Sequence, residues 1–225
     1  MASGSQPPRL YRGLSRSDRH AQRRERLLQA GLELFGTQGY AESSIRAVCA
    51  EASLNSRYFY ESFSSREDLL YHVYKNTVRE VASAVVKATA QADSIEEQVQ
   101  AGLRASWISV TEDRRKAKII SVEAVGVSER LERLRRENRH TFADLLVQNS
   151  RLVTGGGLRL RMDPVLTSRS LIGAVVEMQG DWVAGDVDAS VEEIVDHFIK
   201  LFTAVIYASA AEEPPARPPG RQRRK

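Results

Sequence analysis

A short polar and aromatic run at residues 55–60 holds the side chains of this sequence that are best suited to chemistry. Asn55 and Ser56 supply small polar groups, Arg57 supplies a guanidinium, and Tyr58 supplies a phenolic hydroxyl. A guanidinium pairs bidentately with the edge of a guanine in the major groove, and the N-terminus of a helix favours phosphate. This set of groups on one short element predicts contact with double-stranded DNA.

Two short helices separated by a tight turn would present this run. Ser44 is suited to cap a helix whose apolar face contains Val48 and Ala52, and Asn55 is suited to cap the segment that follows. Phe59 is expected to face inward and hold that segment in place. Helix, tight turn and helix is the arrangement that inserts a reading helix into the major groove.

The rest of the chain also has helical spacing. Apolar residues at intervals of three and four predict a helix over residues 17–37, with Ser17 as its N-cap. The same spacing, bounded by capping and helix-breaking residues, predicts helices over 66–91, 94–112, 115–125, 128–153, 164–185 and 190–209. No stretch shows sustained strand alternation, so we expect an all-α protein with about nine helices.

Nearly fifty positions, residues 23–70, follow the pattern of one family in register. They include Arg23, Leu27, Leu28, Ala30, Leu34, Phe35, Gly39, Tyr40, Ser44, Ile45, Ala50, Ala52, Phe59, Tyr60, Phe63, Arg66, Glu67, Leu69 and Leu70. Through them the chain resembles the DNA-binding domain of the tetracycline-repressor-like (TetR) family of transcriptional regulators. The resemblance implies a three-helix DNA-binding head on a long linking helix, with dimerisation through the last two helices, here 164–185 and 190–209.

The resemblance also implies roles for single residues. Tyr60 matches a tyrosine that contacts phosphate, and Arg66 matches a basic residue that does the same at the start of the linking helix. Ser44 and Arg46 match positions that touch the DNA backbone or nearby bases. Each has a structural alternative, because Tyr60 could be a half-buried core residue, Arg46 a solvated charge and Ser44 only a helix cap.

Two positions depart from the family pattern. Ser53 lies in the turn between the two short helices, where most relatives have glycine because a positive φ is needed. Arg57 stands where relatives have glycine, proline or a small residue. A guanine contact by Arg57 therefore rests on its chemistry and not on the resemblance.

The net charge of +4 is unevenly distributed along the chain. Residues 1–26 contain seven arginines and two acidic residues, and residues 212–225 contain five basic and two acidic residues. These ends are either arms that meet a polyanion or solubilising tails. We expect four parts: a disordered basic arm at 1–16, a helix-turn-helix domain at 17–64, a ligand-binding and dimerisation domain at 65–210, and a disordered Pro/Arg-rich tail at 211–225.

The helices at 94–112, 115–125 and 128–153 exceed what a DNA-binding head and a dimer interface need. In the resembling family such helices enclose a pocket, so we expect a small-molecule effector that is largely apolar. The candidate pocket residues are Trp107, with Ser106, Ser121, Glu123, His140, Thr141 and Met178. The alternative for Trp107 is that it only fills the core.

A homodimer is expected from the apolar content of the last two helices. Their apolar residues are Val175, Met178, Trp182, Phe198, Leu201, Phe202 and Val205. This set exceeds what a single helix pair easily buries, and a large apolar patch marks an interface. A two-fold dimer would also place two heads on a palindromic operator.

Several other classes of protein are disfavoured by the sequence. No apolar run reaches the ~20 residues that span a bilayer, and the first thirty residues lack an apolar signal segment, so we expect a cytoplasmic protein without membrane contact. Cys49 is the single cysteine and is expected to be a small core residue. A metal enzyme would need more than the one Glu137-x-x-His140 and the Glu193/His197 pair, so we expect no catalytic residues, metal or cofactor.

The sequence therefore predicts a DNA-binding transcriptional regulator, a repressor that a small-molecule ligand releases from a palindromic operator. The alternatives are an activator or a ligand-independent regulator of the same fold, and a helical protein-interaction adaptor with a vestigial head.

Overall fold

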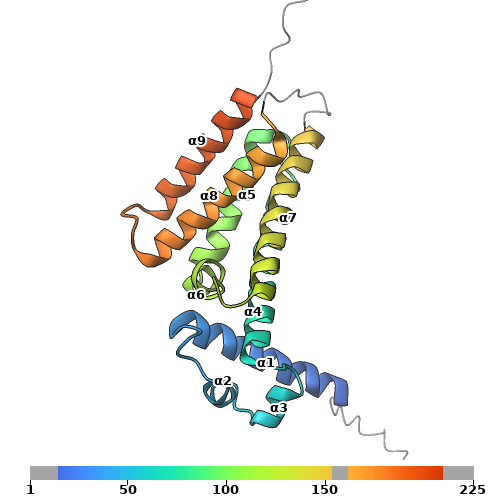
Figure 1. The fold of residues 1–225 in the computed structure, drawn as a ribbon. Helices are drawn as coiled ribbons and strands as arrows, with labels where there is room; N and C mark the ends of the chain where they lie inside the picture. The colour runs from blue at the N-terminus through green and yellow to red at the C-terminus, as the bar shows by residue number, and fades with distance from the viewer. Residues whose placement is uncertain (1–14, 154–161, 210–225) are drawn as a thin grey trace, which may run out of the picture. The chain divides into compact units, whose positions relative to one another are not determined.

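The computed structural model describes residues 15–153 and 162–209 of the chain (Figure 1). Within them the elements are α1 Arg16–Thr37, α2 Ile45–Glu51, α3 Ser56–Tyr60, α4 Arg66–Thr89, α5 Ile95–Thr111, α6 Arg114–Lys118, the π-helical segment η1 Ile119–Glu123, α7 Glu129–Val153, α8 Pro164–Ala184 and α9 Val191–Ser209. The described residues contain no strand, which confirms the all-α prediction. The chain divides into two compact units, residues 1–73 and 74–225.

The predicted arm and tail fall mostly outside the described residues. Residues 1–14 of the arm and all of the tail at 211–225 belong to the part of the chain that the structure does not describe. The disorder predicted for them stays a prediction.

The first helix begins earlier than predicted, and its N-cap is Ser15 rather than Ser17. The Ser15 hydroxyl accepts a hydrogen bond from the Asp18 backbone N–H at 3.1 Å, and the Asp18 carboxylate accepts one from the Ser15 N–H at 3.0 Å. Hydrogen bonding to the Ser15 hydroxyl, followed by that to the Ser15 N–H, holds the pKa of the Asp18 carboxyl below its ordinary value. Ser15 is the cap because Asp18 lies at the third helical position after it and closes a capping box.

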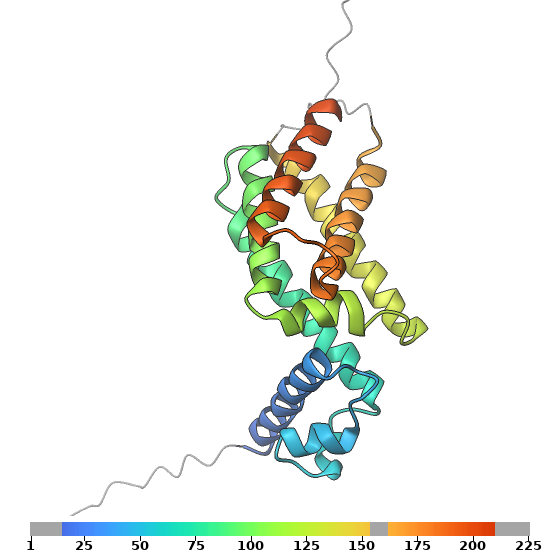
Figure 2. The same cartoon turned by 90° about the vertical axis from the view of Figure 1, so that its left-hand side faces the viewer.

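The core of the first unit is formed where α1 meets α2 and α3 (Figure 2). Leu27, Phe35 and Phe59 are completely buried, as their spacing predicted. Cys49 is also buried, and burial raises the pKa of its thiol, so the prediction of a core cysteine is confirmed. At Gly31 an added Cβ would lie 3.0 Å from Val73 Cγ2, so the close approach of α4 to α1 favours glycine there.

The helix predicted over 115–125 is not one regular α-helix. The α-helical part ends at Lys118, and residues 119–123 form the π-helical segment η1. In this wider turn the adjacent residues Ile119 and Ile120 are both buried, and an ion pair of 3.4 Å joins Lys118 to Glu123 across it. Burial of the two isoleucines alone does not explain the wider turn, because regular helices of this chain also bury consecutive apolar side chains, such as Leu69 and Leu70 of α4.

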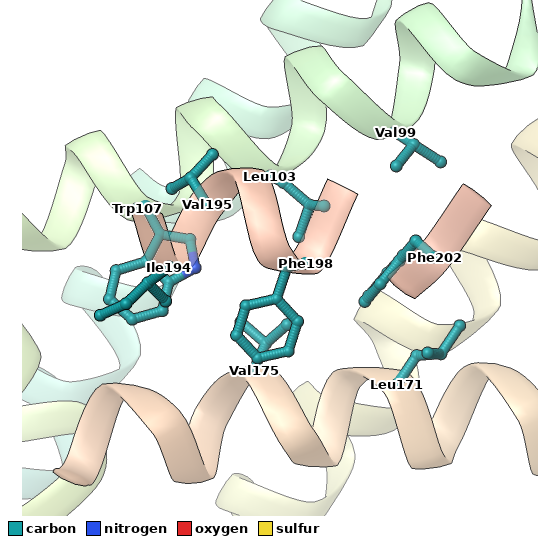
Figure 3. Packing of buried hydrophobic residues seen from close by; sticks show 9 residues of the cluster. All are labelled: Val99, Leu103, Trp107, Leu171, Val175, Ile194, Val195, Phe198 and Phe202. Carbon is teal, nitrogen blue, oxygen red and sulfur yellow. The ribbon is translucent and has the colours of Figure 1, made fainter. Parts of the chain in front are cut away.

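The main core of the second unit lies between α5, α8 and α9. Its buried residues are Val99, Leu103, Trp107, Leu171, Val175, Ile194, Val195, Phe198 and Phe202 (Figure 3). The ring centroid of Trp107 lies 6.4 Å from those of Trp182 and Phe198. Trp107 is therefore a core residue, held by aromatic partners from two other helices.

This core corrects the sequence argument for a dimer interface. Val175, Phe198 and Phe202 are buried inside the second unit, and Met178, Trp182 and Val205 pack against the same cluster. Of the seven apolar residues named for that interface, Leu201 alone is exposed, at 36%. The physical reason is that α5 is a third partner in the packing of α8 and α9 and covers their apolar residues with Val99, Leu103 and Trp107.

The turn between α2 and α3 is closed by a residue in a strained conformation. Ser53 has a φ of 50°, in the left-handed region, as the family pattern predicts for this position. The guanidinium of Arg26 in α1 donates hydrogen bonds to the carbonyl oxygens of Ala52 and Ser53 and holds the turn in place. The arginine contacts stabilise a conformation that serine adopts at a cost.

Replacing Ser53 with glycine should therefore stabilise the protein by about 1 kcal/mol, because glycine adopts a positive φ without a Cβ clash. The measurement is the free energy of unfolding in urea. Ser83→Gly, at an exposed position in the C-terminal half of α4, is the matched control, and it should instead lower stability by about 0.5 kcal/mol. If both variants lose stability, the backbone strain assigned to Ser53 is absent.

Candidate nucleic-acid interface

Both short helices begin at the capping residues that the sequence predicts. Ser44 Oγ accepts a hydrogen bond of 3.1 Å from the Ala47 N–H, and Asn55 Oδ1 accepts one of 3.3 Å from the Tyr58 N–H. These bonds fix where α2 and α3 start. The capping alternative for Ser44 is thus realised, and its contact with DNA stays a prediction.

The α3 helix buries one aromatic side chain and exposes its polar ones. Phe59 is fully buried, whereas Ser56 and Arg57 are exposed and Tyr60 has 60% of its surface accessible. Tyr58 is half-buried beneath the Arg23 guanidinium, whose carbon lies 4.4 Å from the ring centroid. The core alternative for Tyr60 is therefore excluded, because its ring lies on the surface.

Arg57 is the one cation of α3, Ser56–Tyr60, and it is accessible. Its side chain is 83% exposed, and its Nε lies 3.2 Å from Oε1 of Glu61. Glu61 also pairs with Arg23 Nη2 of α1 at 3.6 Å. The ion pair engages Nε, so the two terminal nitrogens of Arg57 are the ones suited to pair with a base edge. Arg46 of α2 is exposed as well.

Arg66 occupies a different environment from the one that the resemblance implies. Its guanidinium donates hydrogen bonds to the carbonyl oxygens of Ala41 and Ser43, and it lies over the ring of Tyr40 at 4.2 Å. These contacts fasten the loop before α2 to the start of α4. Arg66 thus positions α2, and a phosphate contact by Arg66 stays a prediction.

Three arginines counted in the basic N-terminal region belong to the packing of the first unit. Arg23 covers Tyr58, Arg24 lies 5.1 Å from the ring centroid of Phe63, and Arg26 bonds to the turn at Ser53. Charge counting alone could not reveal this. The available signal was their position on the predicted helix, next to the core residue Leu27.

The second unit contains two neighbouring cavities. One, of about 70 Å³, is lined by Tyr74, Val78, Val81, Ser106, Val110, Ile120, Arg135, Asn138, Arg139, Phe142, Ile172, Val175, Val176 and Gln179. The other, of about 90 Å³, is lined by Val85, Thr89, Ile95, Gln98, Val99, Gly102, Leu103, Ser106, Phe142, Leu145, Leu146, Ile172, Val175 and Phe202. Each is several times larger than the roughly 10–15 Å³ that one water needs.

The residues predicted to bind an effector mostly lie elsewhere. Ser106 lines both cavities. Trp107 and Met178 belong to the core between α5, α8 and α9, Ser121 and Glu123 lie in η1, and His140 and Thr141 are exposed on α7. The structure therefore gathers a different group of residues around the internal space.

Sequence reasoning missed the α7 residues that line the first cavity. Arg135, Asn138 and Phe142 follow the core residue Leu131 at helical intervals of four, seven and eleven. They continue the apolar stripe of α7, and an arginine on such a stripe signals a buried charge.

In the described part of the chain, no group of three or more His, Cys, Asp or Glu residues is placed to hold a metal. None of the described helices is both long and apolar enough to span a bilayer.

Comparisons with known proteins agree with this geometry. Residues 27–73 match the family model described as bacterial regulatory proteins, tetR family. A search of curated protein sequences found no significant match.

Solved structures with the same fold cover most of the chain. A TetR-family transcriptional regulator from Syntrophomonas wolfei is 17% identical, with a TM-score of 0.71, over 83% of this chain and 96% of that one. The fatty acid degradation regulator FadR of Bacillus halodurans is 16% identical, with a TM-score of 0.70, over 80% and 93%. FadR of Bacillus subtilis, solved in complex with stearoyl-CoA, is 15% identical, with a TM-score of 0.72, over 80% and 98%.

These matches confirm the resemblance that residues 23–70 suggested. Residues 27–73 match the model of the tetR family of bacterial regulatory proteins, and the described residues have the fold of solved TetR-family transcriptional regulators.

Proposed function

We propose that this chain is a transcriptional regulator that reads double-stranded DNA with α3. The observation that carries the proposal is the two-sided character of α3, whose Phe59 is fully buried while Arg57 and Tyr60 are exposed. A reading helix needs one side fixed to its domain and the other side free to enter the major groove. Arg46 and Ser56 extend the same exposed set of polar groups.

We further propose that the protein represses transcription and that a small molecule in the second unit releases it from DNA. Tyr74, Val78 and Val81 line the first cavity, and all three belong to α4. The same helix begins at Arg66, which bonds to the loop preceding α2. An effector in the cavity would thus touch the helix that leads into the DNA-binding head, and it acts if it binds one arrangement of that helix better than another. FadR of Bacillus subtilis, which has a similar fold, was solved with stearoyl-CoA.

The working form in this proposal is a homodimer that uses α8 and α9. Both helices expose apolar side chains in addition to those in the core, since Leu166 is 67% exposed and Leu201 is 36% exposed. Exposed leucines on the last two helices are suited to a two-fold interface. A dimer supplies the two heads that a palindromic site requires.

The first test is binding of the full chain to the DNA upstream of its own gene. We expect a palindromic segment to bind at least about a thousandfold more tightly than a scrambled duplex at near-physiological salt. An electrophoretic shift titration of both duplexes measures this ratio. Equal affinity for the two duplexes would mean that the upstream DNA contains no specific operator, and it would overturn the proposal that the protein regulates its own gene region.

Tyr60 and Arg57 separate positioning contacts from reading contacts. Tyr60→Phe removes only a hydroxyl, so we expect about fivefold weaker binding to the operator and to single-base variants of it alike, because a phosphate contact carries no sequence information.

Arg57→Ala is the contrasting variant in the same titration. It should change the preference at one base pair by about 1–3 kcal/mol, because a guanidinium distinguishes guanine from the other bases. If both variants bind every duplex as the unaltered protein does, α3 is not the recognition helix.

The dimer is tested by sedimentation at micromolar concentration, where the unaltered chain should have twice its sequence mass. Leu166→Glu combined with Leu201→Glu places charges on the proposed interface and should shift the protein toward a monomer. Val86→Glu, which changes an exposed apolar residue of α4, is the matched control and should leave the dimer intact. A monomeric unaltered chain would contradict the proposal.

A further inference from the structure

The first cavity of the second unit contains a charged residue in unusual surroundings. Arg135 lines this cavity and has only 8% of its surface exposed. Most other lining residues are apolar, among them Val78, Val110 and Ile172. A buried guanidinium in such surroundings needs partners for its N–H groups, because an unpaired buried donor is costly.

The described residues satisfy Arg135 only in part. Its Nη1 lies 2.8 Å from Oε1 of Glu132, whereas its Nε is buried and has no hydrogen-bond partner among the described residues. The Glu132 oxygen also accepts a hydrogen bond of 2.8 Å from the Gly126 N–H. That N–H, followed by Arg135, holds the pKa of the Glu132 carboxyl below its ordinary value, so Glu132 is ionised and pairs with one side of the guanidinium.

The charge around the cavities favours an anion. Arg139, one turn after Arg135 on α7, lines the same cavity. None of the residues lining either cavity in the described chain is acidic. Two arginines thus face one carboxylate that lies outside the lining, which leaves a net positive charge in surroundings of low dielectric constant. A second anion would complete this arrangement.

The second cavity supplies an apolar extension of the first. The two cavities share Ser106, Phe142, Ile172 and Val175. The second is otherwise lined mostly by apolar side chains, with Gln98 and Thr89 as its polar members. A slender molecule could therefore place a charged end in the first cavity and an apolar body in the second.

We propose that this pair of cavities binds an amphipathic organic anion, with a carboxylate beside Arg135 and a narrow hydrocarbon body extending past Phe142 toward Leu146. This names the chemical class of the effector in the proposed function. Only the regulatory consequence of binding rests on that function. Binding itself is measured without DNA. The modest cavity volumes favour a short unbranched chain over a bulky ring system.

The test uses the full chain with three probes of equal length: octanoate, octan-1-ol and octylammonium. Isothermal titration calorimetry measures affinity, and thermal unfolding measures stabilisation by mass action. We expect octanoate to bind about 10- to 100-fold more tightly than octan-1-ol, and octylammonium to bind most weakly. Equal binding of octanoate and octan-1-ol by the unaltered protein would overturn the proposal without any variant being needed.

Variants then locate the carboxylate. Arg135→Met should reduce octanoate affinity about 10- to 100-fold and leave octan-1-ol binding unchanged. Arg133→Met, on the same helix with a side chain that is 55% exposed, is the matched control and should change neither. Ser106→Leu should weaken both probes, because Ser106 lines both cavities. If Arg135→Met fails to fold, Arg135→Lys keeps a cation there, and octanoate should still be preferred over octan-1-ol.

Two further outcomes would overturn the inference. Octanoyl-CoA binding more tightly than octanoate would show that the recognised group is not a free carboxylate. Loss of octanoate binding in Arg133→Met equal to that in Arg135→Met would indicate a general charge effect. If the protein binds a specific operator but not octanoate, only this inference is overturned. If it binds octanoate but no specific operator, the proposed function is overturned and the inferred anion site stands.

Discussion

The DNA-binding head depends on the burial of Phe59. A helix as short as Ser56–Tyr60 does not form alone in water, because the cost of fixing its first turn exceeds the gain from so few hydrogen bonds. Tertiary contacts must hold it. Phe59 is completely buried and packs near Phe63, and Arg23 of α1 covers the neighbouring Tyr58. The exposed side chains of α3 point in a fixed direction only because the buried side of the helix is held in place by these contacts.

The second unit is packed in two different ways. Between α5, α8 and α9 the aromatic and aliphatic residues around Trp107 are closely packed. Next to this core, the residues of α4, α5, α7 and α8 leave two cavities and a partly satisfied arginine. A protein that only needed a stable scaffold would gain by filling that space with apolar side chains. Retaining the cavities and the charge agrees with the ligand site proposed above.

The elements that could be predicted from the sequence are those set by local chemistry. The caps at Ser44 and Asn55 and the inward position of Phe59 follow from spacing and hydrogen-bonding groups within a few residues. The N-cap of α1 was predicted at Ser17 and lies at Ser15, a local choice between two serines. Other features are decided by distant partners, which spacing along the chain does not reveal. Arg66 is held by carbonyl groups more than twenty residues away, and the apolar excess of α8 and α9 is absorbed by α5. The π-helical turn at residues 119–123 interrupts the helix predicted over 115–125, and nothing in the local sequence pattern distinguishes it from a regular helix.

The arginines show most clearly why composition alone does not define a site. Each guanidinium carries the same charge, yet the surface beneath it decides what it does. Arg24 and Arg66 lie over aromatic rings and serve packing, and Arg57 reaches into solvent from a helix anchored on its other side. Arg135 is buried beside space that no side chain fills. A cation over an aromatic ring is already stabilised, an exposed cation gains from any nearby phosphate, and a buried cation with an unpaired donor favours an anion that fits its cavity. The last two are the environments in which an arginine selects a ligand.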